Sequence, residues 1–334
     1  MEKVFVVDVG FGFTKWLYQN KKGKIRSCYK KIGDSWLVGE KALLETGSRY
    51  LRTVEELVDT YPVFVKASEE KAGIKESERS GIVITAGLPC SIFEDEEASF
   101  FVEKLEKKLR GLNYKDVFVF PQGLGGIKWF LKNNPEARGN VLGLDVGFNT
   151  VIAVLYSVDE REILVSRTYY KKGVHDLTTS LLLPRIRKFL GERALTPIEL
   201  NYLMEHKQLQ IGFDAVDLTP EIEESVEEYV QDLISFIIND LKSSFGIVPF
   251  SYVVFMGGGA NWLKDKVEGK KVKIVVLDEP EFANAFGFRE KALEILDVKS
   301  NKKTEKELDE LTEEEMFNKA LSGEVVDELL GRKG

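Results

Sequence analysis

The most regular feature of the chain is a short apolar run that stops at an acid and a glycine-rich turn. Val4–Lys15 reads VFVVDVGFGFTK, so four apolar positions precede Asp8, and Gly10 and Gly12 follow it. A continuous apolar run of this kind predicts a buried strand, and glycine permits a tight turn in which the backbone approaches a ligand closely. Phe13–Tyr18 is expected to return as the partner strand.

The same pattern occurs again in the middle of the chain. Val141–Thr150 reads VLGLDVGFNT, and the tetrapeptide Asp-Val-Gly-Phe begins at both Asp8 and Asp145. Either stretch alone is also compatible with a plain β-hairpin that has no function. Two strand–acid–glycine hairpins near the starts of two halves, however, predict a duplicated domain in which both hairpins face one ligand.

Elsewhere, apolar runs that end at glycine or proline alternate with stretches of helical period. Strands are expected at 4–9, 13–18, 25–31, 81–88, 115–120, 141–147, 150–158, 162–170, 252–256 and 271–277. Helices are expected at 95–110, 127–133, 175–190, 194–207, 220–245 and 281–296. Each half therefore reads as a strand meander followed by strand–glycine–helix units, which indicates an α/β fold.

The same pattern gives the expected domain bounds. We place lobe I at 1–143 and lobe II at 144–297, with an inserted small subdomain at about 34–78 and a helical subdomain at about 190–230. Lysine, glutamate and aspartate dominate from 298, and Thr312 and Glu315 form a capping box ahead of an amphipathic stretch. We interpret 298–334 as a charged linker and a C-terminal amphipathic helix, which packs back on the chain, binds a partner or a neighbouring subunit, or is disordered.

Composition narrows the classes of function. A chain of 334 residues exceeds one ordinary core, and its net charge of −8 argues against general, direct binding to nucleic acid. Cys28 and Cys90 are far apart and show no metal or redox spacing, so we expect two free thiols in a reducing compartment. No apolar run is long enough to span a membrane. We therefore expect a cytoplasmic protein without a membrane partner.

An acid and a lysine beside a glycine-rich turn suit a metal–phosphate ligand. The acid acts on phosphate through magnesium, and the lysine contacts phosphate oxygens directly. Asp8 and Lys15 supply this pair in the first hairpin, and Asp145 stands in the second. The triplet Gly257–Gly259, after the strand at 252–256, would let a nucleotide base lie against bare backbone.

Five motifs in this order resemble those of the superfamily of actin, heat-shock chaperone and sugar-kinase ATPases. Asp8–Lys15 resembles its first phosphate motif in the form that actins have, and Leu144–Thr150 resembles the second. Phe120–Gly123 and Phe282–Phe288 resemble the two connecting motifs, and Phe255–Asn261 resembles the adenosine motif. The length and the insertion are most similar to the ParM/StbA-type bacterial and archaeal actins.

The resemblance implies an actin-like fold: two duplicated ribonuclease H-like lobes, each a mixed five-stranded sheet with helices, and a nucleotide cleft between them. Asp8 and Asp145 would hold hydrated Mg²⁺, with Asp145 also near the attacking water. Gln122 would orient that water, and a glutamine there predicts slow turnover. ATP or ADP would be bound by Gly10, Phe11, Gly12, Phe13, Thr14, Lys15, Gly147, Phe148, Asn149, Thr150, Gly173, Gly257, Gly258, Gly259 and Ala260.

Two further expectations concern residues outside this set. Asn284 would support the hinge helix rather than touch the nucleotide, and the outer wall of the base pocket has the candidates Glu199, Glu205 and Lys207. Such a protein would bind ATP, hydrolyse it slowly and polymerise head to tail into cytoskeletal filaments. In ParM-like systems the filament moves plasmid DNA through an adaptor protein.

Two rival functions are compatible with the same motifs. A small-molecule kinase of this fold would show ATP turnover that a sugar or an acid stimulates, without filaments. A non-filamentous ATP-binding scaffold would stay monomeric until a partner is added.

Overall fold

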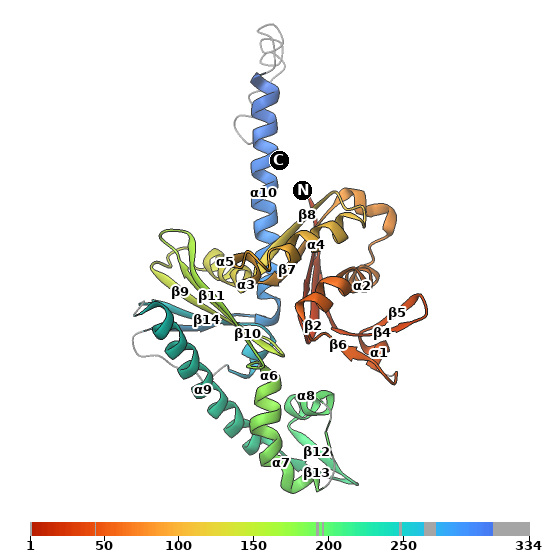
Figure 1. The fold of residues 1–334 in the computed structure, drawn as a ribbon, viewed down its shortest axis with the longest axis vertical. Helices are drawn as coiled ribbons and strands as arrows, with labels where there is room; N and C mark the ends of the chain where they lie inside the picture. Colours follow the sequence, from red (N-terminus) through yellow and green to blue (C-terminus); the bar gives the residue numbers. More distant parts are fainter. Residues whose placement is uncertain are drawn as a thin grey trace.

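The computed structural model describes residues 2–309 except 44, 192–193, 196, 247–248 and 264–271. Two five-stranded sheets dominate it, and helix α10 (Ala283–Asp309) stands between them and projects beyond both (Figure 1). The capping box at Thr312 and the amphipathic helix expected after it lie outside the described residues.

The first sheet contains β1 (Lys3–Val9), β2 (Phe13–Tyr18), β3 (Lys21–Arg26), β7 (Ile82–Pro89) and β8 (Asp116–Gln122). Its order is β3-β2-β1-β7-β8. The first three strands form an antiparallel meander, whereas β7 and β8 run parallel to β1. The strands β1 and β7 are buried along almost their whole length, as expected for central strands covered on both faces.

The second sheet repeats this topology. It contains β9 (Asn140–Val146), β10 (Thr150–Ser157), β11 (Glu162–Tyr170), β14 (Tyr252–Met256) and β15 (Lys273–Val276) in the order β11-β10-β9-β14-β15. Again the first three strands are antiparallel and the last two run parallel to the first. The predicted α/β fold with two duplicated mixed sheets is confirmed, and we call each sheet with the helices that pack on it lobe I and lobe II.

The strand expected at 25–31 is wrong as a single element. The chain leaves β3 at Arg26, and β4 (Cys28–Ile32) belongs to a separate three-stranded sheet. The N–H of Ser27, between the two strands, donates to the Gly12 carbonyl at 2.9 Å, which ties the change of direction to the first hairpin loop. The small sheet is completed by β5 (Ser35–Val38) and β6 (Arg49–Tyr50), with α1 (Glu40–Leu43) beside them.

Helix α2 (Val54–Ala72), within the stretch assigned to the insertion at 34–78, packs on the first sheet as well as beside the small sheet. The side chain of Tyr61 is fully buried in this contact. Its hydroxyl donates to the Val7 carbonyl at 2.6 Å and accepts from the Gly87 N–H at 3.0 Å. The helix is therefore part of lobe I, and the separate small sheet spans a shorter stretch than expected.

The helix expected at 95–110 begins later, as α4 (Phe100–Arg110), and a short helix that was not expected, α3 (Ser91–Glu94), precedes it. The Asp95 carboxylate accepts hydrogen bonds from the N–H groups of Glu97 and Ala98, at 2.9 and 3.3 Å. A short acidic side chain that bonds its own backbone favours a turn over a helix interior, and this explains the break.

Lobe II carries the longer helices. They are α6 (Val174–Asp176), which continues through a π-helical segment (Leu177–Leu182) into α7 (Leu183–Leu190), then α8 (Pro197–His206) and α9 (Thr219–Phe245). A hairpin of β12 (Gln208–Ile211) and β13 (Asp214–Asp217) was not expected. Gly212 has φ +64° at the first of two loop positions, where a type II′ turn requires glycine.

The helices that follow the last strands exchange sheets. Helix α5 (Leu124–Asn133) follows β8 of the first sheet, but its Ile127 and Phe130 pack on the second sheet. Helix α10 follows β15 of the second sheet, but its Ala285 and Phe288 pack with Val4 and Val6 on the first sheet. The packing of the lobes therefore does not follow a sequence boundary at 143.

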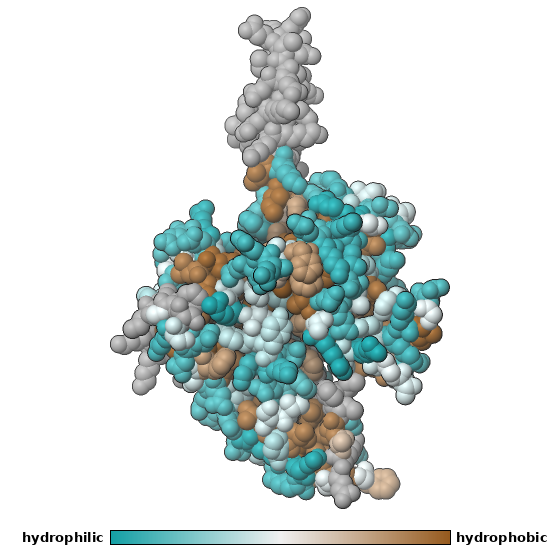
Figure 2. All heavy atoms as spheres, in the orientation of Figure 1, coloured by the Kyte–Doolittle hydropathy of each residue, from teal (hydrophilic) through white to brown (hydrophobic). Residues whose placement is uncertain are grey.

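The linker expected from 298 is wrong for its first part, because α10 continues to Asp309. The Lys299 ammonium donates to the Asp116 carboxylate at 2.7 Å, so this part of the helix still contacts lobe I. None of the helices in the described part of the chain is long and apolar enough to cross a membrane. Figure 2 shows hydrophilic side chains over most of one face, with small apolar groups between them.

Candidate functional site

The two hairpin loops close in the same way. The Gly10 N–H donates to the Phe13 carbonyl at 3.1 Å, and the Gly147 N–H donates to the Thr150 carbonyl at 2.8 Å. Within the described chain, the N–H groups at 11, 12, 148 and 149 make no backbone hydrogen bond. Adjacent free N–H groups in a turn are a common way to bind phosphate oxygens.

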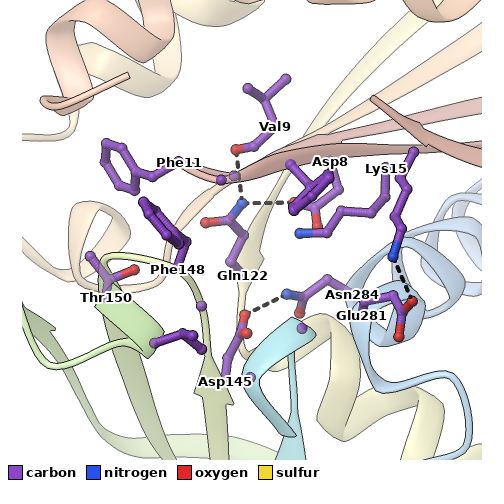
Figure 3. Close-up of a pocket in the computed structure, with 18 of the residues that line it drawn as sticks. Asp8, Val9, Phe11, Lys15, Gln122, Asp145, Phe148, Thr150, Glu281 and Asn284 are labelled. Carbon is purple, nitrogen blue, oxygen red and sulfur yellow. Dashed lines mark hydrogen bonds and ion pairs between the residues drawn. The ribbon is translucent and has the colours of Figure 1, made fainter. Parts of the chain in front are cut away.

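Both loops face one cavity of about 370 Å³, a size that suits a small-molecule ligand. The acids stand at its centre, and their side chains point toward one another from the two lobes (Figure 3). Asp8 is 2% exposed and Asp145 is 9% exposed. Of the expected site residues, those that line the cavity are Asp8, Gly10, Phe11, Gly12, Phe13, Lys15, Gln122, Asp145, Gly147, Phe148, Thr150, Gly258 and Gly259.

The remaining expected site residues lie outside this lining: Thr14, Asn149, Gly173, Gly257 and Ala260. For three of them the structure shows a supporting contact instead. The Thr14 hydroxyl is buried against the Ser27 hydroxyl at 3.0 Å. A Cβ at Gly173 would meet the Gly147 carbonyl oxygen at 2.5 Å, and one at Gly257 would overlap the Asp145 carboxylate. These glycines therefore let backbone pass directly behind the second hairpin and its acid.

Other cavity residues were not assigned to it from the sequence. They are Val9, Lys24, Leu57, Ile152, Val174, Asn261, Trp262, Glu281 and Asn284, and Glu205 is the one outer-wall candidate that lines the cavity. Lys24 lies directly opposite Lys15 in the pairing of β2 with β3. A correct prediction of the turn between these strands would therefore have placed Lys24 at the cavity. Lys24 reaches Glu281 at 3.3 Å, and the Asn261 amide donates to the same carboxylate at 2.9 Å.

The side-chain amide of Gln122 has a defined orientation. Its Nε2 donates to Asp8 Oδ1 at 2.7 Å and to the Val9 carbonyl at 3.3 Å. Both partners are acceptors, so the nitrogen must stand on this side. Figure 3 shows the Gln122 oxygen pointing away from Asp8. Within the described chain, this oxygen makes no hydrogen bond and is available to accept one from a water molecule.

The carboxyl group of Asp145 is in an unfavourable environment for its charge. Burial raises its pKa to about 6, and the negative charge of Asp8 acts in the same direction. The Lys15 ammonium and the hydrogen bond from Asn284 oppose this rise. The Asn284 Nδ2 donates to Asp145 Oδ2 at 2.7 Å. Two buried carboxylates whose negative charges are only partly balanced by neighbouring groups suit a site that receives a cation.

The donor set also fits hydrated Mg²⁺. This ion commonly takes one or two carboxylates and completes its coordination with water and phosphate oxygens. The described residues contain no group of three or more histidine, cysteine or acidic side chains that could enclose a metal ion. Asp8 and Asp145 are thus suited to Mg²⁺ that arrives with a phosphate ligand.

No protein-family model matches the sequence, and no curated protein matches it. Solved structures do match. The archaeal actin homolog Ta0583 superimposes with a TM-score of 0.70 over 87% of this chain and 99% of its own, at 19% identity. The chain has the actin fold.

Other proteins with the actin fold are similar over the same extent. A ParM filament structure from Clostridium botulinum has a TM-score of 0.67, 18% identity and coverage of 88% of this chain and 99% of its own. MreB 5 of Spiroplasma citri has a TM-score of 0.62, 11% identity and coverage of 90% and 99%. Ta0583 has been solved in complex with ADP, and this MreB 5 is bound to AMPPNP.

Proposed function

We propose that the chain is an actin-like protein of the ParM/StbA type. It binds ATP with Mg²⁺ in the cavity, hydrolyses it slowly and assembles head to tail into filaments. The observation that carries the proposal is the meeting of two duplicated acid hairpins, from the two lobes, at one cavity with free backbone N–H groups around it. The nucleotide complexes of Ta0583 and MreB 5, which have the same fold, support it.

The chain supplies two kinds of group for a triphosphate. The N–H groups of both loops and the Lys15 ammonium would bind phosphate oxygens. Asp8 and Asp145 would hold Mg²⁺, and this ion would neutralise negative charge on the transferred phosphate. The glycines at 258 and 259, which line the cavity, would lie against the nucleoside.

Gln122 would orient the attacking water. Its fixed amide nitrogen leaves the oxygen free to accept from that water, which places the nucleophile without taking its proton. An amide is a weaker catalyst than a base in this position, so slow hydrolysis is the expected result. Slow turnover suits a protein in which hydrolysis limits the lifetime of an assembly.

Assembly is supported by the similarity to the ParM filament, whose structure covers 88% of this chain. A head-to-tail contact is heterologous and does not close, so it builds a filament. An adaptor protein that links the filament to DNA would complete a segregation system. The net charge of −8 favours such an indirect link over direct coating of DNA.

The proposal is tested by phosphate release together with sedimentation and negative-stain microscopy. Each is measured with Mg²⁺ and ATP, with ADP, and with a non-hydrolysable ATP analogue; GTP is run in parallel. We expect phosphate release that requires Mg²⁺, and filaments with ATP or the analogue. The absence of polymer under every nucleotide would contradict the assembly. Phosphate transfer to an added sugar or acid without filaments would favour the kinase alternative.

A further inference from the structure

Asn284 has after the second sheet a place equivalent to that of Gln122 at the end of the first sheet. Gln122 ends β8, the last strand of the first sheet, and Asn284 follows β15, the last strand of the second. Each donates its amide nitrogen to the acid of the sheet that precedes it in the chain: Gln122 to Asp8 and Asn284 to Asp145, both at 2.7 Å. The duplication thus gives two amide–carboxylate pairs, which face each other across the cavity (Figure 3).

The orientation of the Asn284 amide is also fixed. Its Oδ1 accepts from the N–H of Gly123 at 2.9 Å and from the N–H of Gly126 at 3.1 Å. Two donors on one side require the oxygen there, so the nitrogen must face Asp145. The side chain is buried, and this leaves it no alternative partner in solvent.

These bonds join three segments of the chain. Asn284 lies on α10, Asp145 is the penultimate residue of β9, and Gly123 directly follows Gln122 at the start of α5. The Asn284 side chain therefore connects Asp145 to Gly123. Gly123 is the neighbour in sequence of Gln122, whose amide contacts the other acid. A shift of α10 would move Asp145 and Gln122 together.

We propose that Asn284 is a positioning residue for the reaction of this cavity. It aims the Asp145 carboxylate at the site of Mg²⁺ and sets the distance between Asp145 and Gln122 through the N-terminus of α5. This role rests on the proposed Mg²⁺-dependent hydrolysis. Partners that orient a metal-binding carboxylate commonly change metal affinity or activity by about 10- to 100-fold when they are removed.

The test uses the full-length chain with Asn284→Asp. Aspartate keeps an oxygen for the N–H groups of Gly123 and Gly126, but it cannot donate to Asp145 and places a second negative charge against it. We expect single-turnover phosphate release to slow by about tenfold or more. We also expect its Mg²⁺ dependence to change, while ATP affinity in EDTA stays within about threefold of the parent chain, because loop N–H groups and Lys15 are untouched.

Asn134→Ala is the matched control, because Asn134 is bonded to the other end of α5, where its amide donates to the Phe130 carbonyl at 2.9 Å. It is expected to leave rate and Mg²⁺ dependence unchanged. If Asn284→Asp does not fold, Asn284→Ser replaces it, since a short hydroxyl cannot span both partners and brings no charge. A folded Asn284 variant with the parent's rate and Mg²⁺ dependence would overturn the role of Asn284. A parent chain without Mg²⁺-dependent hydrolysis would instead overturn the proposed function, and this inference with it.

Discussion

At the scale of single residues, hydrogen bonds hold the Gln122 amide nitrogen, while its amide oxygen has no partner among the described residues. Replacement of Gln122 by alanine removes the oxygen that would orient water, but keeps the backbone N–H groups of both hairpin loops. We expect the rate of phosphate release to fall by about 10- to 100-fold, because a nucleophile that is held less well reacts more slowly. ATP affinity should stay near that of the parent chain. The two are measured by single-turnover phosphate release and by equilibrium titration.

The control for Gln122→Ala is Gln210→Ala, because Gln210 is exposed on the β12–β13 hairpin, where its amide donates to the Gly212 carbonyl at 3.4 Å. It should change neither quantity. A Gln122→Ala chain that hydrolyses ATP at the parent's rate would remove Gln122 from the proposed mechanism.

We expect Asp145 to make the metal-free protein less stable at neutral pH. Its folded pKa of about 6 lies above its ordinary value of 3.8, so the folded state binds the proton more tightly than the unfolded state does. The free energy of unfolding therefore falls as pH rises from about 4 through 6. Asp145→Asn should raise it by up to about 3 kcal/mol at pH 8 and by about half as much at pH 5. Denaturant unfolding in EDTA measures both values.

Asp59→Asn is the comparison for Asp145→Asn. A hydrogen bond from Lys104 holds the pKa of Asp59 below its usual range, so its loss should bring no gain in stability at pH 8. An equal gain for Asp145→Asn at pH 5 and pH 8 would show that the charge of Asp145 is not the cause.

At the scale of elements, the site depends on the crossing of α5 and α10. A Cβ at Gly287 of α10 would overlap the Gly125 carbonyl of α5, and Asn284 lies one turn earlier on the same helix. Gly287→Ala should therefore lower the free energy of unfolding by about 1–3 kcal/mol or more and slow hydrolysis as well. Thermal unfolding and phosphate release measure the two effects.

Gly81→Ala is the control for this crossing, because a Cβ at Gly81 would meet no atom within 4 Å. It should change neither stability nor rate by a comparable amount. Parent-like stability of Gly287→Ala would mean that the helices separate at little cost, which would argue against a rigid crossing at the site.

The sequence is informative about the site where the chemistry is local. The two acid hairpins can be predicted because the strand, the acid and the glycine turn are contiguous in the sequence. The repeat of the pattern at Asp145 supports the prediction that both hairpins face one ligand. Lys24 and Glu281 were missed, because they enter the cavity through strand register and through the approach of α10 to the first sheet. Helix α2 was placed in the insertion because nothing in its own stretch indicates that Tyr61 bonds strands of the main sheet.

At the scale of the whole molecule, the lobes are joined by more than one covalent connection. Because α5 packs on the second sheet and α10 on the first, each lobe is completed by a helix that follows the other lobe's last strand. A change in the angle between the lobes must therefore act at the point where the two helices cross, beside Asn284. Under the proposed function, a nucleotide in the cavity and the arrangement of the lobes would be coupled through the same few side chains, as an ATP-controlled assembly requires.

The β12–β13 hairpin lies at the end of lobe II farthest from the projecting part of α10 (Figure 1). Phe213 at the β12–β13 turn is 105% exposed, and Ile211 and Tyr202 are exposed nearby in the sequence. An exposed aromatic side chain at a protruding turn is costly in water and suits a contact with a second copy of the chain. Phe213→Ser should raise the critical concentration for polymerisation by about tenfold, which corresponds to the loss of part of the 1.5–3 kcal/mol that burial of a phenylalanine contributes.

Sedimentation over a range of protein concentrations measures this change, and ATP affinity, which should be unaffected, is measured beside it. Phe100→Ser is the matched control, because Phe100 on α4 is 51% exposed but belongs to lobe I. An equal rise for both variants would indicate a general effect of surface hydrophobicity. A critical concentration that Phe213→Ser leaves unchanged would exclude the hairpin tip from the filament contact, while a selective rise would place it at the end of one subunit that meets the next.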